Sequence, residues 1–351
     1  MRSFRSDNNA GLCPEARDAL LSVDDGSHAL GYGDDEFSAD TESAFQRVFG
    51  AQVRAFFVTT GTAANTLAIA ALTEPWQRVL CHPLSHWNEH ESTAPERITG
   101  CRTQVLEGRD GKLRPEALVG LTSAVGADAD VHEPQPGVLT LTNPNELGLV
   151  YTEREVRALC HAAHAAGYRV HVDGARFANA VAHLGCDPVA ISIAAGVDAL
   201  SFGGTKNGLA MGEAVIFFPQ GDGRDFERAV SRFPFLRKST GHLVSKHRFI
   251  SAPFRAVLSD GIWLQHAAHA NAMATRLGDG LEDCGLAPVV PVQTNGVFIR
   301  LPEVVDRALR EAGHGYYGFG DPKDGITRLL CSFDTTKEDV DSFVHVARDA
   351  C

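Results

Sequence analysis

Two segments carry side chains whose types and positions could do chemistry together. Lys206 stands in a glycine-rich loop, Ala199-Leu-Ser-Phe-Gly-Gly-Thr-Lys-Asn-Gly208, directly after an apolar, strand-like run. Asp173 ends a second such run, Tyr168-Arg-Val-His-Val172, and Gly-Ala-Arg176 follows it. A lysine and an aspartate at the carboxyl ends of parallel strands are what a pyridoxal phosphate (PLP) site needs, because the lysine forms a Schiff base and the aspartate pairs with the pyridinium nitrogen. Taken alone, Lys206 has a simpler interpretation as an ordinary surface lysine.

A third segment has the pattern of a phosphate-binding turn. Ala55-Phe-Phe-Val58 predicts a short strand, and the small residues Thr59-Thr-Gly-Thr-Ala-Ala-Asn65 lead from it into a helix over residues 66–72. Free backbone N–H groups and the helix dipole converge at such a turn, which favours a phosphate there. An alanine-rich helix with a threonine cap would give the same pattern without any ligand.

The surrounding elements predict an α/β fold. Strand-like runs alternate with helices up to Phe218, which implies a mostly parallel sheet with helices on both faces. Later strands and helices predict a small α/β domain. We expect an N-terminal arm over residues 1–15, a large domain over 16–245 and a small C-terminal domain over 246–351. Beyond Phe218, strands are expected over 286–291, 296–301 and 326–332, and helices over 225–233, 241–274, 303–312 and 337–350.

Composition and charge narrow the class of protein. Of 351 residues, 44% are hydrophobic and 22% are charged, which is ordinary for a soluble globular protein. The net charge of -12 argues against nucleic-acid binding, and no apolar run approaches the roughly 20 residues of a membrane span. The polar N-terminus does not fit a signal peptide, and the eight scattered cysteines form no CxxC pair. We therefore expect a cytoplasmic enzyme with reduced thiols.

Six segments spread along the chain form a recognisable series. They are Ser6-Asp-Asn8, Tyr32-Gly-Asp34, Gly61-Thr-Ala-Ala-Asn65, His86 with Glu91, His171-Val-Asp-Gly-Ala-Arg-Phe-Ala-Asn179 and Ser201-Phe-Gly-Gly-Thr-Lys-Asn207. In this order they resemble the threonine aldolase family of PLP-dependent enzymes, over nearly the whole chain. The resemblance implies PLP fold type I, the aspartate aminotransferase type. In that fold the large domain has a mostly parallel seven-stranded sheet flanked by helices, and a small α/β domain follows it.

The resemblance implies how PLP is held. Lys206 would form the Schiff base, and Asp173 would keep the pyridine nitrogen protonated so that the ring can accept electrons. Gly61, Thr62 and Asn65 would hold the phosphate at the helix N-terminus.

The resemblance also implies a site for the substrate carboxylate. Arg176 would lie near the PLP hydroxyl and the carboxylate, Arg328 would be the second carboxylate-binding arginine, and Ser6 would add a third contact. A planar guanidinium binds a carboxylate through two parallel hydrogen bonds, so lysine would be a poor substitute. For Arg176 an ion pair at the edge of the sheet is the alternative.

His86 matches the histidine that stacks on the cofactor ring in this family. Glu91 is a candidate to hold water or to assist proton transfer from the substrate hydroxyl, unless it is a surface carboxylate. His82, His86 and His90 have the spacing of metal ligands on one helix face, but Pro83 argues against a regular helix, so no metal is expected.

One position differs from the family pattern, and one basic segment resembles it. Some threonine aldolases have a histidine where this chain has Glu146, which leaves open the identity of the base toward the β-hydroxyl. Lys238 and Lys246 resemble a segment that reaches the phosphate of a neighbouring subunit, although both could be plain solvated lysines. Tyr32 is expected to shape the substrate pocket.

The chain is therefore predicted to be a PLP-dependent carbon–carbon lyase. It would cleave a β-hydroxy-α-amino acid of the threonine, allo-threonine or phenylserine type to glycine and an aldehyde. A homodimer or homotetramer with shared active sites is implied, with neither nucleic acid nor membrane as a partner. The alternatives are a related PLP-dependent lyase or transaldolase and a non-catalytic PLP-binding protein. An NAD dehydrogenase is disfavoured because a GxGxxG turn is missing.

Overall fold

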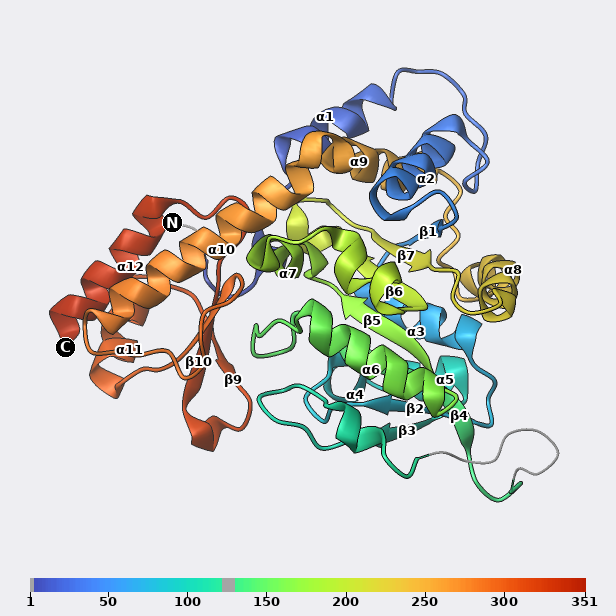
Figure 1. The fold of residues 1–351 in the computed structure, drawn as a ribbon. Coiled ribbons are helices and arrows are strands. Elements are labelled where there is room, and N and C mark those ends of the chain that lie inside the picture. Colours follow the sequence, from blue (N-terminus) through green and yellow to red (C-terminus); the bar gives the residue numbers. More distant parts are fainter. Residues whose placement is uncertain (1–2, 122–129) are drawn as a thin grey trace.

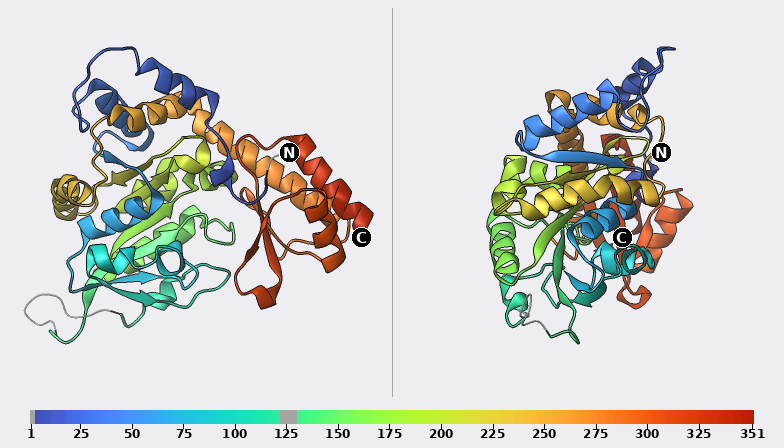
Figure 2. Two further views of the ribbon diagram at one scale, coloured as in Figure 1. Left: turned by 180° about the vertical axis from the view of Figure 1, so that it is seen from behind. Right: turned by 90° about the vertical axis from the view of Figure 1, so that its right-hand side faces the viewer.

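The computed structural model describes residues 3–121 and 130–351 (Figure 1). A large domain holds the central sheet, and a small domain lies beside it. The long helix α10 (Ile262–Glu282) runs from one domain to the other, as the view from behind also shows (Figure 2). Within the described residues, no helix has both the length and the apolar character that crossing a membrane requires.

The large domain is built on a seven-stranded sheet in the order β1-β7-β6-β5-β4-β2-β3. Strands β6, β5, β4, β2 and β3 run parallel, whereas β7 is antiparallel to both of its neighbours. This sheet confirms the predicted fold class. The strands are β1 (Arg54–Val58), β2 (Gln77–Cys81), β3 (Arg102–Val105), β4 (Gln135–Thr142), β5 (Arg169–Gly174), β6 (Ala199–Gly203) and β7 (Glu213–Phe217).

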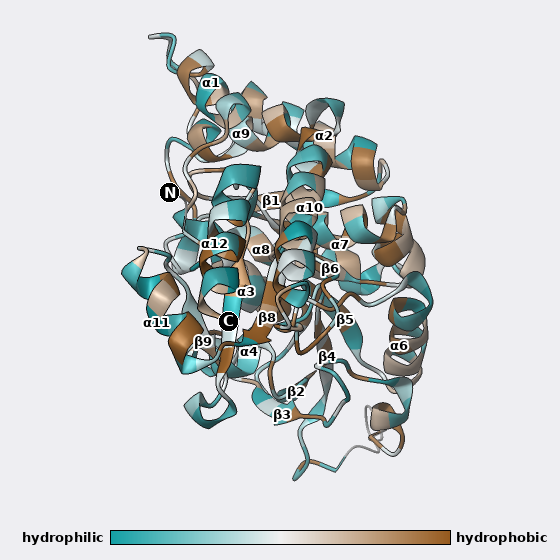
Figure 3. Cartoon of the chain, turned by 90° about the vertical axis from the view of Figure 1, so that its left-hand side faces the viewer, coloured by the Kyte–Doolittle hydropathy of each residue, from teal (hydrophilic) through white to brown (hydrophobic). Residues whose placement is uncertain are grey.

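Helices cover both faces of the sheet, and an apolar core lies under each layer. Successive side chains of a strand point to opposite faces, so Phe57 enters one core and Phe56 the other. Individual helices show brown and teal sides in Figure 3, as expected when one side packs on a core. Helices α1 (Pro14–Ser22), α2 (Glu36–Phe49), α6 (Glu153–Ala165), α7 (Phe177–Leu184) and α9 (Arg248–Leu258) contribute to the first core, and α3 (Gly61–Leu72), α5 (Ala94–Thr99) and α8 (Arg224–Ser239) to the second.

The small domain has a three-stranded antiparallel sheet in the order β8-β10-β9. The strand expected over residues 286–291 does not form, and only Pro288 makes an isolated bridge to Ile299. Pro288 and Pro291 lack the N–H groups that a ladder needs, which explains the difference. The elements are β8 (Gly296–Arg300), α11 (Glu303–Glu311), β9 (Tyr317–Phe319), β10 (Ile326–Leu330) and α12 (Lys337–Ala350).

The core of the large domain extends beyond residue 245, where the sequence placed the boundary. Residues of α9 and the first turns of α10 pack into the large-domain core, and α10 enters the small-domain core from Met273 onward. The long helix expected over residues 241–274 is interrupted at Asp260 and Gly261, whose φ angles of 53° and 67° are left-handed. Phe4 of the N-terminal arm packs in the small-domain core.

Candidate active site

Most of the residues singled out from the sequence gather at one edge of the large sheet. Strands β2, β4, β5 and β6 end at this edge, where open α/β sheets bind their ligands. A cavity there encloses about 410 Å³ of space, counted out to its open mouth. Seven of the predicted site residues line it, namely Gly61, Asn65, His86, Glu91, Asp173, Arg176 and Lys206.

Lys206 and Asp173 reach this cavity from neighbouring strands. Asp173 is paired in register with Ser201 of β6, and Lys206 lies on the short 3-10 helix that follows the same strand. Tight packing explains the glycines before the lysine, because a Cβ on Gly203 would collide with the carbonyl oxygen of Ala175. The close packing fixes the path of the chain into Lys206.

Glu213 holds the lysine loop from the opposite side. It is the first residue of β7, and its Oε2 accepts a 2.8 Å hydrogen bond from the N–H of Gly204. The side chain is buried beside Lys206, and burial raises its pKa to about 7. Glu213 therefore places a buried carboxyl group with a raised pKa beside the candidate Schiff-base lysine.

The start of α3 supplies donors on another side of the cavity. Thr60 caps this helix, since its hydroxyl accepts a 3.2 Å hydrogen bond from the N–H of Ala63. The N–H groups of Gly61 and Thr62 precede the first intrahelical bond, so a helix of this kind leaves them for an anion. The helix start therefore offers the backbone donors that a phosphate needs, and the phosphate site stays a prediction.

Asn65 occupies a different place from the one expected. Its side-chain amide donates to Oε1 of Glu91 at 3.0 Å and to Oδ2 of Asp173 at 2.9 Å, instead of remaining available for a phosphate. Glu91 in turn bonds Nδ1 of His86 at 2.8 Å. A hydrogen-bonded chain therefore joins His86, through Glu91 and Asn65, to Asp173.

The hydrogen bonds from His86 through Glu91 and Asn65 to Asp173 determine the charge and orientation of His86. Burial opposes a charged imidazole, but the hydrogen bond and charge of Glu91, together with the charge of Asp173, raise the pKa of His86. With Nδ1 bonded to Glu91, Nε2 is the ring nitrogen left for a ligand or water. Glu91 itself is buried, and its Oε1 bonds both His86 and Asn65.

Arg176 is held by a carboxylate of the N-terminal arm. Its Nε and Nη2 donate to Asp7 at 2.6 Å and 2.9 Å, and Asn295 donates to the same carboxylate at 3.0 Å. Although burial opposes ionisation, Arg176 lowers the pKa of Asp7. The pair fixes the guanidinium plane and leaves Nη1 for a further acceptor.

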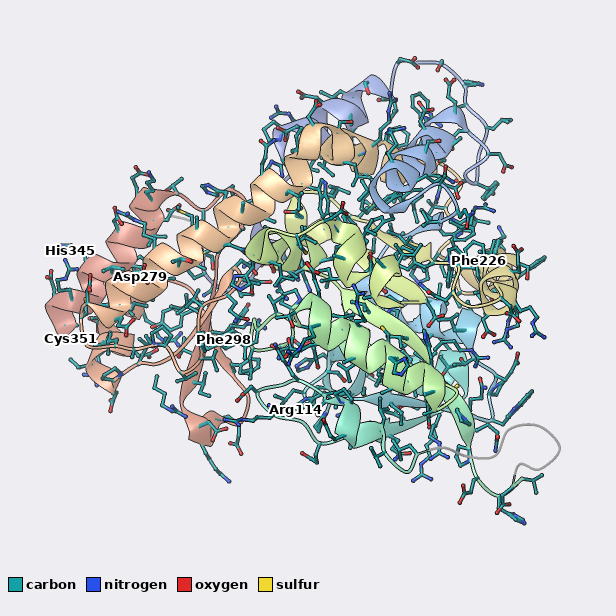
Figure 4. The ribbon with its side chains drawn as sticks, viewed as in Figure 1. Arg114, Phe226, Asp279, Phe298, His345 and Cys351 are labelled. Atoms are coloured by element: carbon teal, nitrogen blue, oxygen red, sulfur yellow. The ribbon has the colours of Figure 1, made fainter. Side chains whose placement is uncertain are left out.

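Arg328 lies across a second cavity from Arg176. The two arginines line about 290 Å³ of space together with Glu146 and Phe298, which Figure 4 shows on the small domain. Nε of Arg328 is buried without a hydrogen-bond partner among the described residues. Burial and the charge of Arg176 lower the pKa of Arg328, so an added anion would relieve an unfavourable charge.

Glu146 stands between the two cavities and contributes to the walls of both. Burial, and then the charge of Asp173, raise the pKa of Glu146 above its ordinary value. A carboxyl group therefore faces the region between the candidate lysine and the arginine pair, at the position where the sequence departs from some relatives.

Five predicted site residues lie outside the wall of the first cavity, namely Thr62, Arg328, Ser6, Tyr32 and Lys238. The hydroxyl of Ser6 accepts a 3.2 Å hydrogen bond from the N–H of Asn8 at the start of a short 3-10 helix. Tyr32 is 49% exposed, and Nζ of Lys238 lies 4.8 Å from the centre of its ring. Tyr32 and Lys238 thus form a surface pair of their own.

The sequence did not assign roles to Asp7, Glu213 or Asn295. Asp7 was visible in a segment shared with a known family, but its partner is 169 positions away. Glu213 was detectable as an acidic residue directly before an apolar run. Asn295 carried no local signal, because only the packing of the two domains brings it to Asp7.

Comparisons with known proteins agree with this site. A model of the beta-eliminating lyase family matches residues 3–303. The low specificity L-threonine aldolase of Pseudomonas aeruginosa is 39% identical over 350 residues, covering 99% of this chain and 96% of that protein.

Solved structures agree as well. Leishmania major threonine aldolase superimposes with a TM-score of 0.89 at 27% identity, with 99% of each chain covered. An aspartate aminotransferase of Thermus thermophilus, at 19% identity and a TM-score of 0.68 over 99% of both chains, shares the fold. The chain therefore belongs to the beta-eliminating lyase family and is a member of its threonine aldolase group.

Proposed function

We propose that this protein is a PLP-dependent aldolase that cleaves a β-hydroxy-α-amino acid to glycine and an aldehyde. The observation that carries the proposal is the pair Arg176 and Arg328 beside the Lys206 cavity. One guanidinium is already aligned by Asp7, and the other has a buried Nε without a partner. Such a pair suits the carboxylate of an amino acid.

The residues present fit PLP. Lys206 would hold it covalently, Asp173 would pair with its ring nitrogen, and the N–H groups of Gly61 and Thr62 would bind its phosphate. When bound, PLP supplies an electron sink for the electrons released as the Cα–Cβ bond of the substrate breaks. The hydrogen bond from Asn65 orients Asp173 for this pairing.

The chain's own residues would orient the substrate and move the proton. Arg176, Arg328 and Ser6 would bind the carboxylate and so set the direction of the Cα–Cβ bond, which is a positioning effect. Nε2 of His86, directly or through a water, would take the proton of the β-hydroxyl, and Glu91 would stabilise the charged imidazole through Nδ1. Glu146 would face the β-substituent.

We also infer a homodimer or homotetramer in which subunits share active sites. Tyr32 and Lys238 support this, because they are paired on the surface and a basic side chain there could bind a phosphate in a neighbouring subunit. Tyr32 has a left-handed φ of 64°, and strain of this kind is often retained for function. A cytoplasmic location is proposed because all eight cysteines are free thiols.

A direct assay tests the proposed reaction. Purified protein with PLP should release an aldehyde and glycine from L-threonine, L-allo-threonine or phenylserine, and Lys206→Ala should abolish both this activity and the visible absorbance of the lysine-bound cofactor. If the wild type binds PLP yet none of the three substrates yields an aldehyde, the aldolase proposal is wrong. Turnover of other β-substituted amino acids would then favour a related lyase.

A further inference from the structure

Three side chains of the types that bind transition metals meet away from the active-site cavities. Cys13 lies at the start of α1, Glu15 in its first turn, and His266 in the first turns of α10. The Cys13 thiol sulfur, a Glu15 carboxylate oxygen and a ring nitrogen of His266 all lie within 4.8 Å of one another. The histidine is 251 positions beyond Glu15 in sequence (266 − 15), so only the fold brings the group together.

The spacing within this cluster matches ligands of a shared metal better than a hydrogen bond. Oε2 of Glu15 lies 3.6 Å from Nε2 of His266, whereas hydrogen bonds to nitrogen span about 2.7–3.2 Å. Oxygen and nitrogen ligands at about 2.0–2.1 Å from a tetrahedral zinc lie roughly 3.3 Å apart. A small contraction would bring this pair to the spacing of metal ligands, and the Cys13 sulfur lies within 4.8 Å of both ligand atoms.

One ligand atom in the cluster has no hydrogen-bond partner. Oε2 of Glu15 is shielded from solvent without such a partner among the described residues. The sulfur of Cys13 is buried and accepts a 3.4 Å hydrogen bond from the N–H of Ala16, and its thiol is also within hydrogen-bonding reach of the Glu15 side chain. A sheltered carboxylate oxygen is costly to leave unpaired, and a cation bound between it and the neighbouring sulfur would satisfy it.

We propose that Cys13, Glu15 and His266 form a binding site for a divalent transition metal of the zinc class. One sulfur, one nitrogen and one oxygen ligand leave a fourth tetrahedral position for water, a set that suits Zn²⁺ or Co²⁺. Phe333 packs against the His266 ring, with centroids 5.1 Å apart, and restricts its orientation. The site does not depend on the proposed aldolase reaction.

The proposed metal site lies next to the attachment points of the loop that carries Lys206. The N–H of Cys13 donates to the carbonyl of Gly208 at 2.8 Å, and the side chain of Asn207 donates to the carbonyl of Trp263 at 2.9 Å. The loop that carries Lys206 is thus attached to the starts of both α1 and α10. A metal that links these two helices would stabilise the base of this loop.

Cobalt titration of the metal-free, full-length protein without a histidine tag tests the proposal. The wild type should bind one Co²⁺ per chain and develop the near-ultraviolet band of a cobalt–thiolate bond. Cys13→Ser should abolish the band while keeping the helix cap, since serine is a favoured N-cap residue. Glu15→Gln and His266→Asn should weaken binding at least tenfold. Cys351→Ser, which removes an exposed thiol, should leave the band unchanged.

Other outcomes would overturn the site. A band that persists in Cys13→Ser or disappears in Cys351→Ser, or a wild type that binds no stoichiometric cobalt, would each do so. Zinc should also raise the Tm of the wild type but not that of Cys13→Ser, and an equal shift in both would contradict the proposal. Retained PLP absorbance in each variant would show that it is folded. All these readouts are independent of amino-acid turnover.

Discussion

The carboxylate of Asp7 and the guanidinium of Arg176 form two parallel hydrogen bonds, of 2.9 Å and 2.6 Å, across the boundary between the N-terminal arm and the large domain. Asp7 is almost completely buried, and Asn295 of the C-terminal third of the chain donates to it as well. One carboxylate therefore connects the arm, the large domain and the C-terminal third at the edge of the candidate site.

Replacing Asp7 by asparagine should damage both stability and substrate binding. The buried Arg176 would lose its compensating charge, which costs about 3–5 kcal/mol for a pair of this kind. Urea unfolding should show this loss, and the KM for the amino acid should rise because Arg176 is no longer aligned. Asp18→Asn is the control: its pair with Arg17 is exposed, and its loss should cost less than about 1 kcal/mol. Equal effects of the two substitutions would contradict a special role of Asp7.

Arg328→Lys should weaken the binding of the substrate carboxylate. A lysine keeps the charge but cannot form two parallel hydrogen bonds, and hydrogen bonds to charged groups contribute about 1.5–3 kcal/mol. We expect KM to rise by about 10- to 100-fold with a smaller change in kcat. Arg300→Lys, on the exposed end of neighbouring β8, should leave KM unchanged. An unchanged KM in Arg328→Lys would remove Arg328 from the proposed substrate site.

Glu91→Gln should lower the pKa of His86. The carboxylate stabilises the protonated imidazole, so in the wild type the neutral base appears only at higher pH. The rising limb of kcat/KM against pH should therefore move to lower pH in the variant, with a lower maximum because the charged imidazole is less stabilised. Glu89→Gln, an exposed residue of the short helix α4 (His86–Glu89) that carries His86, is the matched control. Identical profiles of Glu91→Gln and the wild type would exclude His86 as the titrating base.

Glu213→Gln should stabilise the protein at alkaline pH. The folded state raises the pKa of Glu213 from 4.5 to about 7, so between these values the folded state binds more protons than the unfolded state, and stability falls as pH rises. Glutamine removes this dependence. The free energy of unfolding of the variant, relative to the wild type, should increase by up to ~3 kcal/mol between pH 4.5 and pH 8. A difference that does not vary with pH would show that Glu213 ionises normally.

The sequence predicted the parts of the site that follow strands. Lys206 and Asp173 each come after an apolar run, and a parallel sheet places the ends of such runs at one edge. The carboxylate partner of Arg176 could not be found in this way, because Asp7 reaches it only through tertiary packing. The role of Asn65 was missed for the same reason: its position in a helix start suggested a phosphate, whereas its side chain points to two carboxylates.

Edge strands and helix ends were the parts of the fold that were hardest to predict from the sequence. Strand β3 has partly exposed, mostly polar residues at the edge of the sheet, so it carries no apolar run. Strand β9 is three residues long and also lies at an edge. The predicted domain boundary fell at the start of a helical region. Helix α9 lies beyond that boundary but belongs to the large domain, because its apolar residues pack in the large-domain core, and the length of a helix does not reveal such packing.

The packing of Phe4 has a consequence for the order in which parts of the protein fold. Phe4 lies in the small-domain core against Phe343, with ring centroids 5.2 Å apart, and its carbonyl accepts a 2.8 Å hydrogen bond from the N–H of Leu330. Phe4 thus has its partners 326 and 339 positions further along the chain (330 − 4 and 343 − 4). We expect Asp7 to reach Arg176 only after the small-domain core has formed around Phe4, so the amino-acid site is completed late in folding.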